Sequence, residues 1–395
     1  MTKLRLSARA NLLKPSPTLA MTGKARTMKA AGIDVISFAA GEPDFNTPES
    51  ICRTAIEAIE AGHTKYTPSA GTPELKKAIV GKLQRENGLD YRAEQIVVSC
   101  GAKHSVYNAM QVLVNEGDEV ILLAPYWMTY ADQVMLAGGR PVVVHAGHDN
   151  GYVPTAEQIA EAVTPRTRAI ILNSPCNPTG AMIPAETLAK IGALAVRHGF
   201  WIVADEIYER LTYGNAHQSA AALGAEVASQ TITIGGCSKT YAMTGWRIGF
   251  AAAPDDVAQA MSNLQDQVTS NPTAFAQAGA VTAFNLPTEA VEAMRAEFRA
   301  RRDLIVGLLR QITGLKVHTP EGAFYVFPNV EAYLQGRMRT DVELADHLLA
   351  EAHVATIPGS VFEGPGHLRL SYAASRQDIE RGVERIAAAL KNLAE

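Results

Sequence analysis

Short apolar runs alternate with helical patterns along the middle of the chain, and this alternation constrains the fold more than any other feature. Five apolar runs have the length of strands, and they cover residues 95–101, 118–126, 168–175, 200–208 and 231–238. Three stretches between them have the spacing of amphipathic helices, at 102–117, 128–139 and 185–199. Neighbouring parallel strands need a crossover of this kind, so the pattern predicts an α/β fold with a mainly parallel sheet covered on both faces.

The last third of the chain has a different order of elements. A long charged helical stretch at 288–312 precedes two short apolar runs, a helical stretch at 341–352 and a final helix from Ser375. This mixture predicts a smaller α+β domain that also includes the first residues of the chain. We therefore predict a large domain over residues 47–285 and a small domain formed by residues 1–46 and 286–395.

Composition excludes several classes of function. The chain has 395 residues, of which 47% are hydrophobic and 19% charged, and its net charge is −4. A large core is expected, and no basic field favours nucleic acid or an anionic membrane surface. The cysteines are far apart and form no C-x-x-C pair, which fits a reducing compartment and predicts no metal site. The chain also lacks a signal-peptide pattern and an apolar run of membrane-spanning length, so a cytoplasmic location is expected.

Polar and glycine-containing stretches follow the apolar runs, where ligands bind in sheets of this kind. The stretch "GGCSKTYAMTGWRIG" places Lys239 among small residues, eight positions before Arg247. Lys239 could be an ordinary surface lysine. A nucleotide phosphate loop is excluded, because no glycine directly precedes Lys239. Small neighbours permit close approach to a ligand, and Arg247 could bind a phosphate through two hydrogen bonds.

Other strand ends carry groups that complement one flat ligand, although each has a plainer explanation. Asp205 is either a cap or the partner of a protonated ring nitrogen. Asn177 marks a tight turn or a ligand contact, and Trp127 is either a core residue or a stacking surface. With Tyr208, Ser238, Arg247 and the anion-binding turn at Gly101, Ala102 and Lys103, these groups predict pyridoxal 5′-phosphate as the cofactor.

These motifs together resemble one known family. "GCSKTYAMTGWRIG" is similar in full to the pyridoxal-phosphate attachment pattern of class-I aminotransferases. "GEPDFNTP", "KYTPSAGTPELKKAI", "APYW", "NSPCNPTG", "DEIYERLTY" and "LRLSYA" resemble the same family in order, over nearly the whole chain. "KPSPTLAMT" and "GAKH" resemble the subgroup of bacterial aspartate and aspartate/prephenate aminotransferases. Ala102 and Cys176 depart from the subgroup, where glycine and serine are more frequent.

The resemblance implies a fold-type-I enzyme with a mainly parallel seven-stranded sheet, and a homodimer with shared active sites. Lys239 resembles the lysine that attaches the cofactor, and Asp205 the partner of its ring nitrogen. Asn177 and Tyr208 resemble the partners of its ring oxygen. Tyr66 resembles a tyrosine that reaches the phosphate from the other subunit. Substrate contacts are implied for Gly41, Trp127, Asn177 and Arg369, with Arg369 binding the α-carboxylate.

The expected reaction moves the amino group of L-aspartate to 2-oxoglutarate in two half-reactions, with amino acids and 2-oxo acids as the only partners besides the second subunit. Lys103 is expected at the distal carboxylate, although it could instead only offset phosphate charge. Lys14 and Thr18 go with use of prephenate in the resembling subgroup, so conversion of prephenate to arogenate is a second expectation. The alternatives are an aromatic or alanine aminotransferase, a carbon–sulfur lyase on the same fold, or a non-catalytic regulatory module.

Overall fold

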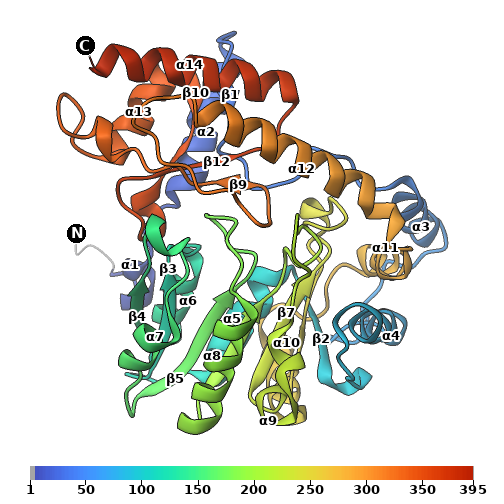
Figure 1. The fold of residues 1–395 in the computed structure, drawn as a ribbon. Helices are drawn as coiled ribbons and strands as arrows, with labels where there is room; N and C mark the ends of the chain where they lie inside the picture. The colour runs from blue at the N-terminus through green and yellow to red at the C-terminus, as the bar shows by residue number, and fades with distance from the viewer. Residues whose placement is uncertain (1–4, 395) are drawn as a thin grey trace.

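The structure, a computed structural model, describes residues 5–394. Its centre is a seven-stranded sheet of order β2-β8-β7-β6-β5-β3-β4 (Figure 1). The strands are β2 (Ile96–Ser99), β3 (Glu119–Ala124), β4 (Arg140–His145), β5 (Thr167–Asn173), β6 (Trp201–Asp205), β7 (Thr231–Gly236) and β8 (Gly249–Ala252). All neighbours from β4 to β7 pair in parallel, whereas β8 is antiparallel to both β7 and β2. The prediction of a mainly parallel α/β sheet is confirmed.

Both faces of this sheet are covered, as the near-continuous apolar strands require. Ile171 of β5 packs in one apolar cluster with Val106 and Met110 of α5 (Ala102–Leu113). Its neighbour Ile170 points to the opposite face, in a second cluster with Ile191 of α8 (Ala185–His198). Successive side chains of a strand point to opposite faces of the sheet, so alternate residues of this apolar run pack against different layers of helices. The same part of the chain contains α6 (Thr129–Leu136), α7 (Ala156–Glu161), α9 (Ala225–Ala228) and α10 (Asp255–Val268).

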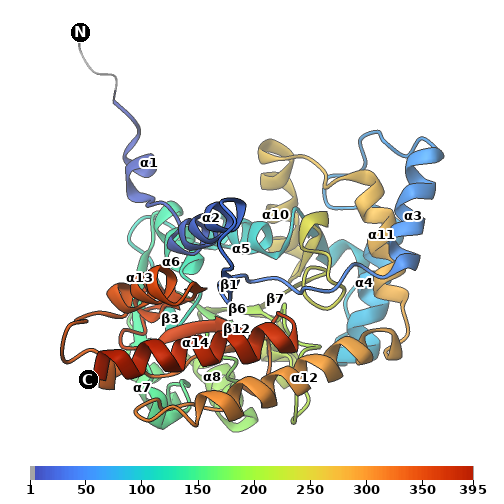
Figure 2. The same cartoon turned by 90° about the horizontal axis from the view of Figure 1, so that it is seen from above.

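Three further helices form a separate layer beside β2. They are α3 (Glu49–Glu60), α4 (Pro73–Lys82) and α11 (Ala274–Asn285), and their apolar faces share a third cluster. Seen from above, this layer lies on one side of the molecule, and α1 (Ala8–Leu12) and α2 (Pro17–Ala30) lie on the other (Figure 2). Among the described residues no helix is both long and apolar enough to cross a membrane.

Two small sheets lie outside the central one, and the first of them joins segments from both ends of the chain. β1 (Ile36–Ser37) pairs in parallel with β10 (Val354–Ala355). A three-stranded sheet joins β11 (Ile357–Pro358), β12 (Leu368–Ser371) and β9 (Tyr325–Val326). The helices α12 (Glu289–Leu309), α13 (Asp341–Glu351) and α14 (Arg376–Ala394) complete this part (Figure 1). This arrangement supports, as a proposal, the division into a large domain over 47–285 and a small domain over 1–46 and 286–395.

Candidate active site

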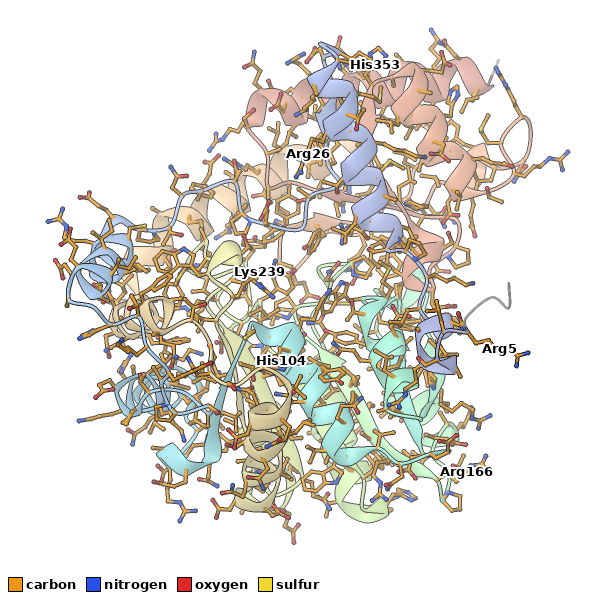
Figure 3. The ribbon with its side chains drawn as sticks, turned by 180° about the vertical axis from the view of Figure 1, so that it is seen from behind. Arg5, Arg26, His104, Arg166, Lys239 and His353 are labelled. Atoms are coloured by element: carbon orange, nitrogen blue, oxygen red, sulfur yellow. The ribbon has the colours of Figure 1, made fainter. Side chains whose placement is uncertain are left out.

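A cavity of about 490 Å³ lies at the carboxyl ends of the parallel strands, where the sheet meets α2 and the segments around Gly41 and Arg369. Most of the site residues expected from the sequence line this one cavity: Thr18, Gly41, Ala102, Lys103, Trp127, Asn177, Asp205, Tyr208, Ser238, Lys239, Arg247 and Arg369. Figure 3 shows Lys239 between the sheet and the helices above it. The parallel topology explains the convergence, because it brings the ends of β3, β5, β6 and β7 to one edge.

Asp205 is the last residue of β6 and is buried. Its carboxylate accepts hydrogen bonds from the Tyr130 hydroxyl at 2.7 Å and from the Ile207 N–H at 3.2 Å. Burial raises the pKa of Asp205 to about 6, although both hydrogen bonds act in the opposite direction. A buried carboxylate of this kind is strongly favoured by a cationic partner, such as a protonated ring nitrogen.

Lys239 follows β7, and its ammonium lies 2.5 Å from the carbonyl oxygen of Gly41. Burial lowers the pKa of Lys239 to about 8. The negative charge of Glu42 opposes the shift, and the positive charges of Arg369 and Arg247 add to it. About a tenth of the amine is therefore neutral at pH 7, far more than for an exposed lysine, and a nucleophile or general base requires this neutral form.

The turn between β2 and α5 is shaped by Gly101 and Arg247. Gly101 has φ +88°, and a Cβ there would meet the Arg247 guanidinium, with the Cζ atom at 2.8 Å. Arg247 itself has φ +56° and donates to the carbonyl oxygens of Thr244 at 3.0 Å and Cys100 at 3.3 Å. The first N–H groups of α5 and the guanidinium thus lie together, in an arrangement suited to a phosphate.

Arg369 of β12 is buried and reaches the cavity from the small sheets. It donates to Asn177 Oδ1 and to the Ala39 carbonyl oxygen, both at 2.9 Å. Its guanidinium also lies 4.6 Å from the centre of the Tyr325 ring. Its Nε atom is buried without a partner among the described residues, so the guanidinium retains capacity for a carboxylate.

Aromatic side chains shape the remaining walls. The Lys103 ammonium lies 4.7 Å above the Trp127 ring, which itself meets Tyr130 edge to face. Partial burial and the charge of Arg247 lower the pKa of Lys103, against the opposing effect of Asp132. The hydroxyl groups of Tyr208 and Tyr325 are 2.9 Å apart. Burial raises the pKa of Tyr208, so its phenol stays protonated and can donate a hydrogen bond.

Three expected residues do not line the cavity of their own chain. Gly101 directly precedes Ala102 in the turn into α5 but is not itself part of the lining. Tyr66 is 92% exposed and lies outside the lining, and Lys14 is likewise exposed and outside it. Ser238 and Ala102 are buried and belong to the lining. Tyr130, Tyr325, Glu42, Thr22 and Arg26 also line the cavity, although sequence reasoning did not identify them. Glu42 directly follows the expected Gly41 in the motif "GEPDFNTP", and Tyr130 lies three residues after Trp127, so both positions carried a signal. No local pattern marks Thr22, Arg26 or Tyr325.

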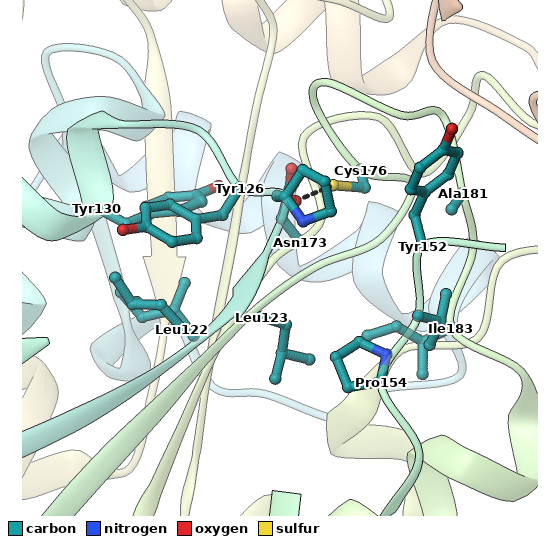
Figure 4. A pocket seen from close by; sticks show the side chains of 13 residues that line it. Leu122, Leu123, Tyr126, Tyr130, Tyr152, Pro154, Asn173, Cys176, Ala181 and Ile183 are labelled. Atoms are coloured by element: carbon teal, nitrogen blue, oxygen red, sulfur yellow. Dashed lines mark hydrogen bonds between the residues drawn. The ribbon is translucent and has the colours of Figure 1, made fainter. Parts of the chain in front are cut away.

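A second, smaller cavity of about 30 Å³ lies beside the first and shares Tyr130 and Asn173 with it (Figure 4). Cys176 lines this smaller cavity, and its thiol lies 3.4 Å from the Pro125 carbonyl oxygen. Burial raises the pKa of Cys176 to about 11, so the thiol stays neutral. The cysteine therefore does not contribute a reactive group to the larger cavity.

One cluster of possible metal ligands exists among residues 5–394, and it consists of Glu206, Glu209 and His217. Its charges already have partners. The Lys82 ammonium contacts Glu209, and His217 Nε2 lies 3.1 Å from a Glu206 oxygen. The cluster is therefore a buried ion-pair network in which a lysine occupies the place of a cation.

The donor set fits pyridoxal phosphate. Asp205 offers an anion for a ring nitrogen, Tyr208 a phenol for the ring oxygen, and Lys239 an amine of lowered pKa. The turn at Gly101 offers N–H groups for a phosphate, and the nearby Arg247 offers a guanidinium. A side chain at position 101 would fill the space between them. These groups come from separate strand ends, which is the expected construction for a bound cofactor in an α/β protein.

Known proteins match the chain in sequence and in structure. Residues 33–386 match the family described as "Aminotransferase class I and II". An aspartate aminotransferase of Geobacillus stearothermophilus is 51% identical over 97% of this chain and 98% of its own length. An aspartate/prephenate aminotransferase of Cereibacter sphaeroides is 44% identical over 95% and 96% of the two chains. The structure of the aspartate aminotransferase from Thermus thermophilus with maleate superposes with a TM-score of 0.94, at 42% identity, over 98% of this chain and 100% of that one.

The family match covers most of the chain, and these relatives are highly similar to it in sequence. Both findings point to the same cofactor as the residues that line the cavity. The chain therefore belongs to the class I and II aminotransferases, a family of pyridoxal-phosphate-dependent enzymes.

Proposed function

We propose that the chain transfers the amino group of L-aspartate to 2-oxoglutarate with pyridoxal phosphate as cofactor. The observation that carries this proposal is the presence of Lys239, Asp205 and Arg369 in one cavity, where burial lowers the pKa of the Lys239 amine towards neutral pH. The aspartate aminotransferase from Geobacillus stearothermophilus, at 51% identity, supports the choice of substrate.

In this proposal the cofactor is held by residues from five strand ends. Ser238, Arg247 and the turn at Gly101, Ala102 and Lys103 bind its phosphate. Trp127 stacks on its ring, Asn177 and Tyr208 bind its ring oxygen, and Asp205 keeps the ring nitrogen protonated. When bound, pyridoxal phosphate supplies an electron sink for the carbanion that forms at the substrate carbon. Tyr130 supports the same step, because its hydrogen bond fixes the orientation of the Asp205 carboxylate.

Lys239 attaches the cofactor and then moves the proton of the substrate α-carbon. The amine must be neutral to accept that proton, and its lowered pKa of about 8 supports this role. Arg369 orients the substrate through its α-carboxylate, with the Gly41 segment beside it. The hydrogen bond from Arg369 to Asn177 ties the substrate-binding cation to the residue assigned to the ring oxygen. The two ligands would therefore be held in a fixed relation.

Lys103 is proposed to bind the distal carboxylate of aspartate, because its ammonium lies at the cavity wall above Trp127. Prephenate also carries two carboxylates, and the Cereibacter relative named for both substrates supports it as a second amino acceptor. Thr18 lines the cavity and is assigned to that substrate, together with Lys14 on the same N-terminal segment.

The active form is proposed to be a homodimer in the cytoplasm. Tyr66 is almost fully exposed and away from its own cavity, which suits a side chain that completes the site of a second subunit. The free cysteines support a reducing compartment.

The direct test incubates the holoenzyme with aspartate and 2-oxoglutarate and identifies the products. Oxaloacetate and glutamate are expected, whereas pyruvate with ammonia would indicate a lyase. Lys239→Ala should retain the cofactor non-covalently through Arg247 and Asp205 but should not turn over. Near-normal turnover by that variant would refute the assignment of Lys239.

The role of Lys103 is tested by comparing donors that differ in the distal group. Lys103→Ala should lower kcat/KM for aspartate by about ten- to a hundredfold, because a charged hydrogen bond is lost. Alanine and phenylalanine, which lack a distal carboxylate, should be much less affected. An equal loss for all donors would leave Lys103 with a phosphate role only.

A further inference from the structure

One face of α2 covers the cavity. Thr18, Thr22 and Arg26 follow one another at intervals of four residues, and all three line the cavity. Residues at this spacing lie on the same side of a helix. Met21 and Ala25, on the adjacent side, are buried in the main apolar cluster and anchor the helix. Because Met21 and Ala25 are packed into the core, the helix cannot rotate freely, and Arg26 stays on the side that faces the cavity.

Arg26 differs from the other cations of the cavity. Lys239 donates to Gly41, Arg247 to Thr244 and Cys100, and Arg369 to Asn177 and Ala39. Lys103 lies over Trp127. The guanidinium of Arg26 is exposed and has no hydrogen bond or ion pair within the part of the chain that the structure describes. Among the described residues, Arg26 is thus the cation of the cavity whose N–H groups are all available to bind a ligand.

The anions of the cavity do not account for Arg26. Asp205 is bound by Tyr130, and Glu42 accepts a hydrogen bond from Thr244 at 2.8 Å. The lining therefore contains five cationic and two acidic side chains. A phosphate and the α-carboxylate of a substrate match Arg247 and Arg369. The remaining positive charge, on Lys103 and Arg26, matches a second carboxylate of the substrate.

The proposed reaction sets a further requirement. Its two half-reactions use dicarboxylic substrates that differ by one methylene, so the distal carboxylate lies at two distances from the reacting carbon. Lys103 is held over the Trp127 ring, whereas Arg26 has a long side chain on α2 without a partner among residues 5–394. An unpaired arginine can follow the more distant carboxylate and bind it through two hydrogen bonds.

We propose that Arg26 is a specificity-determining residue that binds the distal carboxylate of the longer dicarboxylic substrates, glutamate and 2-oxoglutarate. This inference rests on the proposed aminotransferase function. It adds a second cation, from α2, to the one assigned to Lys103. The same helix carries a matched control, because Lys24 is paired with Asp346 at 2.8 Å and does not line the cavity.

The experiment measures the amino-donor half-reaction of the holoenzyme from its absorbance change, with glutamate, glutamine, aspartate and asparagine. Each amide is a neutral counterpart of one acid, so the ratio of acid to amide isolates the distal charge. Arg26→Met should lower kcat/KM for glutamate by about ten- to a hundredfold and change that for glutamine by less than about threefold. The loss with aspartate should be smaller than the loss with glutamate. Arg26→Lys should restore most of the activity with glutamate, and Lys24→Met should behave as the wild type.

Three results would overturn the inference: equal losses for glutamate and glutamine, no loss for either, or a loss with aspartate as large as that with glutamate. A failure of the proposed function is distinguishable from these. In that case the unaltered holoenzyme itself would give no absorbance change with glutamate or aspartate.

Discussion

Lys239 shows how a single side chain obtains its reactivity from its surroundings. A solvent-exposed lysine has a pKa near 10.4 and is almost fully charged at neutral pH. Burial, together with Arg369 and Arg247, lowers the pKa of Lys239 to about 8 despite the opposing charge of Glu42. The hydrogen bond to the Gly41 carbonyl oxygen holds the nitrogen in place whether or not it is protonated. The residue is therefore poised for nucleophilic attack before any substrate arrives.

This pKa gives a prediction for the cofactor-free protein. Acetylation of Lys239 by acetic anhydride should rise with pH through about 8 and then level off, because only the neutral amine reacts. Lys190 is an exposed reference, and its ion pair with Glu186 raises its pKa. Its acetylation should therefore keep rising to higher pH. Peptide mass spectrometry of samples treated at each pH measures both rates, and identical pH profiles would contradict the expected shift.

At this scale the sequence predicts which residues near the ends of strands lie close together. Asp205, Lys239 and Asn177 were expected at the site because the ends of parallel strands converge, and all three line the cavity. Tyr325 and Arg26 were not expected, since each belongs to a segment that reaches the cavity only through packing between the ends of the chain. Whether a side chain of such a segment reaches the cavity depends on how the whole helix or strand is oriented. No local sequence pattern determines that orientation.

Among the structural elements, the turn from β2 into α5 determines the shape of the anion-binding end of the cavity. Gly101 adopts a positive φ, and the Arg247 guanidinium occupies the space that its side chain would need. Gly249 of β8 faces the same turn, where a Cβ would collide with the backbone of Ala102, whose Cα lies 2.8 Å away. Two strands and a helix thus approach closely only because both positions lack a side chain.

Gly101→Ala should therefore weaken cofactor binding, whereas Gly117→Ala should not. Gly117 also has a positive φ, of +81°, but a Cβ there would meet nothing within 4 Å. Both substitutions should lower the free energy of unfolding by about 1–2 kcal/mol through backbone strain. Only Gly101→Ala also displaces Arg247, so its dissociation constant for pyridoxal phosphate should rise by about tenfold or more. Fluorescence titration of the cofactor-free variants measures this, and equal affinities would rule out the proposed role of the turn.

Elements were predictable where one residue pattern was long enough to determine the type. The runs that became β3, β5, β6 and β7 and the helices α5, α8 and α14 lie where the sequence predicts them. β8 was not predicted as a strand, because it is only four residues long and begins with Gly249, the last residue of the motif around Lys239. Its antiparallel pairing with β2 and β7 depends on contacts far along the chain.

For the whole molecule, the main question is whether one chain contains a complete site. Arg247, which is proposed to bind the phosphate, lines the cavity, whereas Tyr66 is 92% exposed and outside the lining. A tyrosine so exposed contributes little to its own chain's stability. Its assignment to the site of a second subunit accounts for that exposure.

Hybrid dimers provide the test. A Tyr66→Phe/Lys239→Ala double variant mixed with wild-type protein should form hybrids in which the wild-type site lacks the Tyr66 hydroxyl group. Mixing the two single variants should instead give hybrids with one intact site and one doubly altered site. Activity per hybrid dimer, isolated by means of two different affinity tags, should be higher for the second mixture. Equal activities of the two isolated hybrids would contradict a shared site.

Different structural elements carry the groups assigned to catalysis and the groups assigned to substrate selectivity, so the two can evolve separately. The groups assigned to the chemistry stand on the ends of rigid strands, whereas Thr18, Thr22 and Arg26 stand on one short helix near the start of the chain. Substitutions on that helix can accumulate without disturbing Lys239 or Asp205. An enzyme built in this way can acquire new substrates by substitutions on the cavity side of α2, while Met21 and Ala25 keep the helix anchored and the strand ends keep their reactive groups.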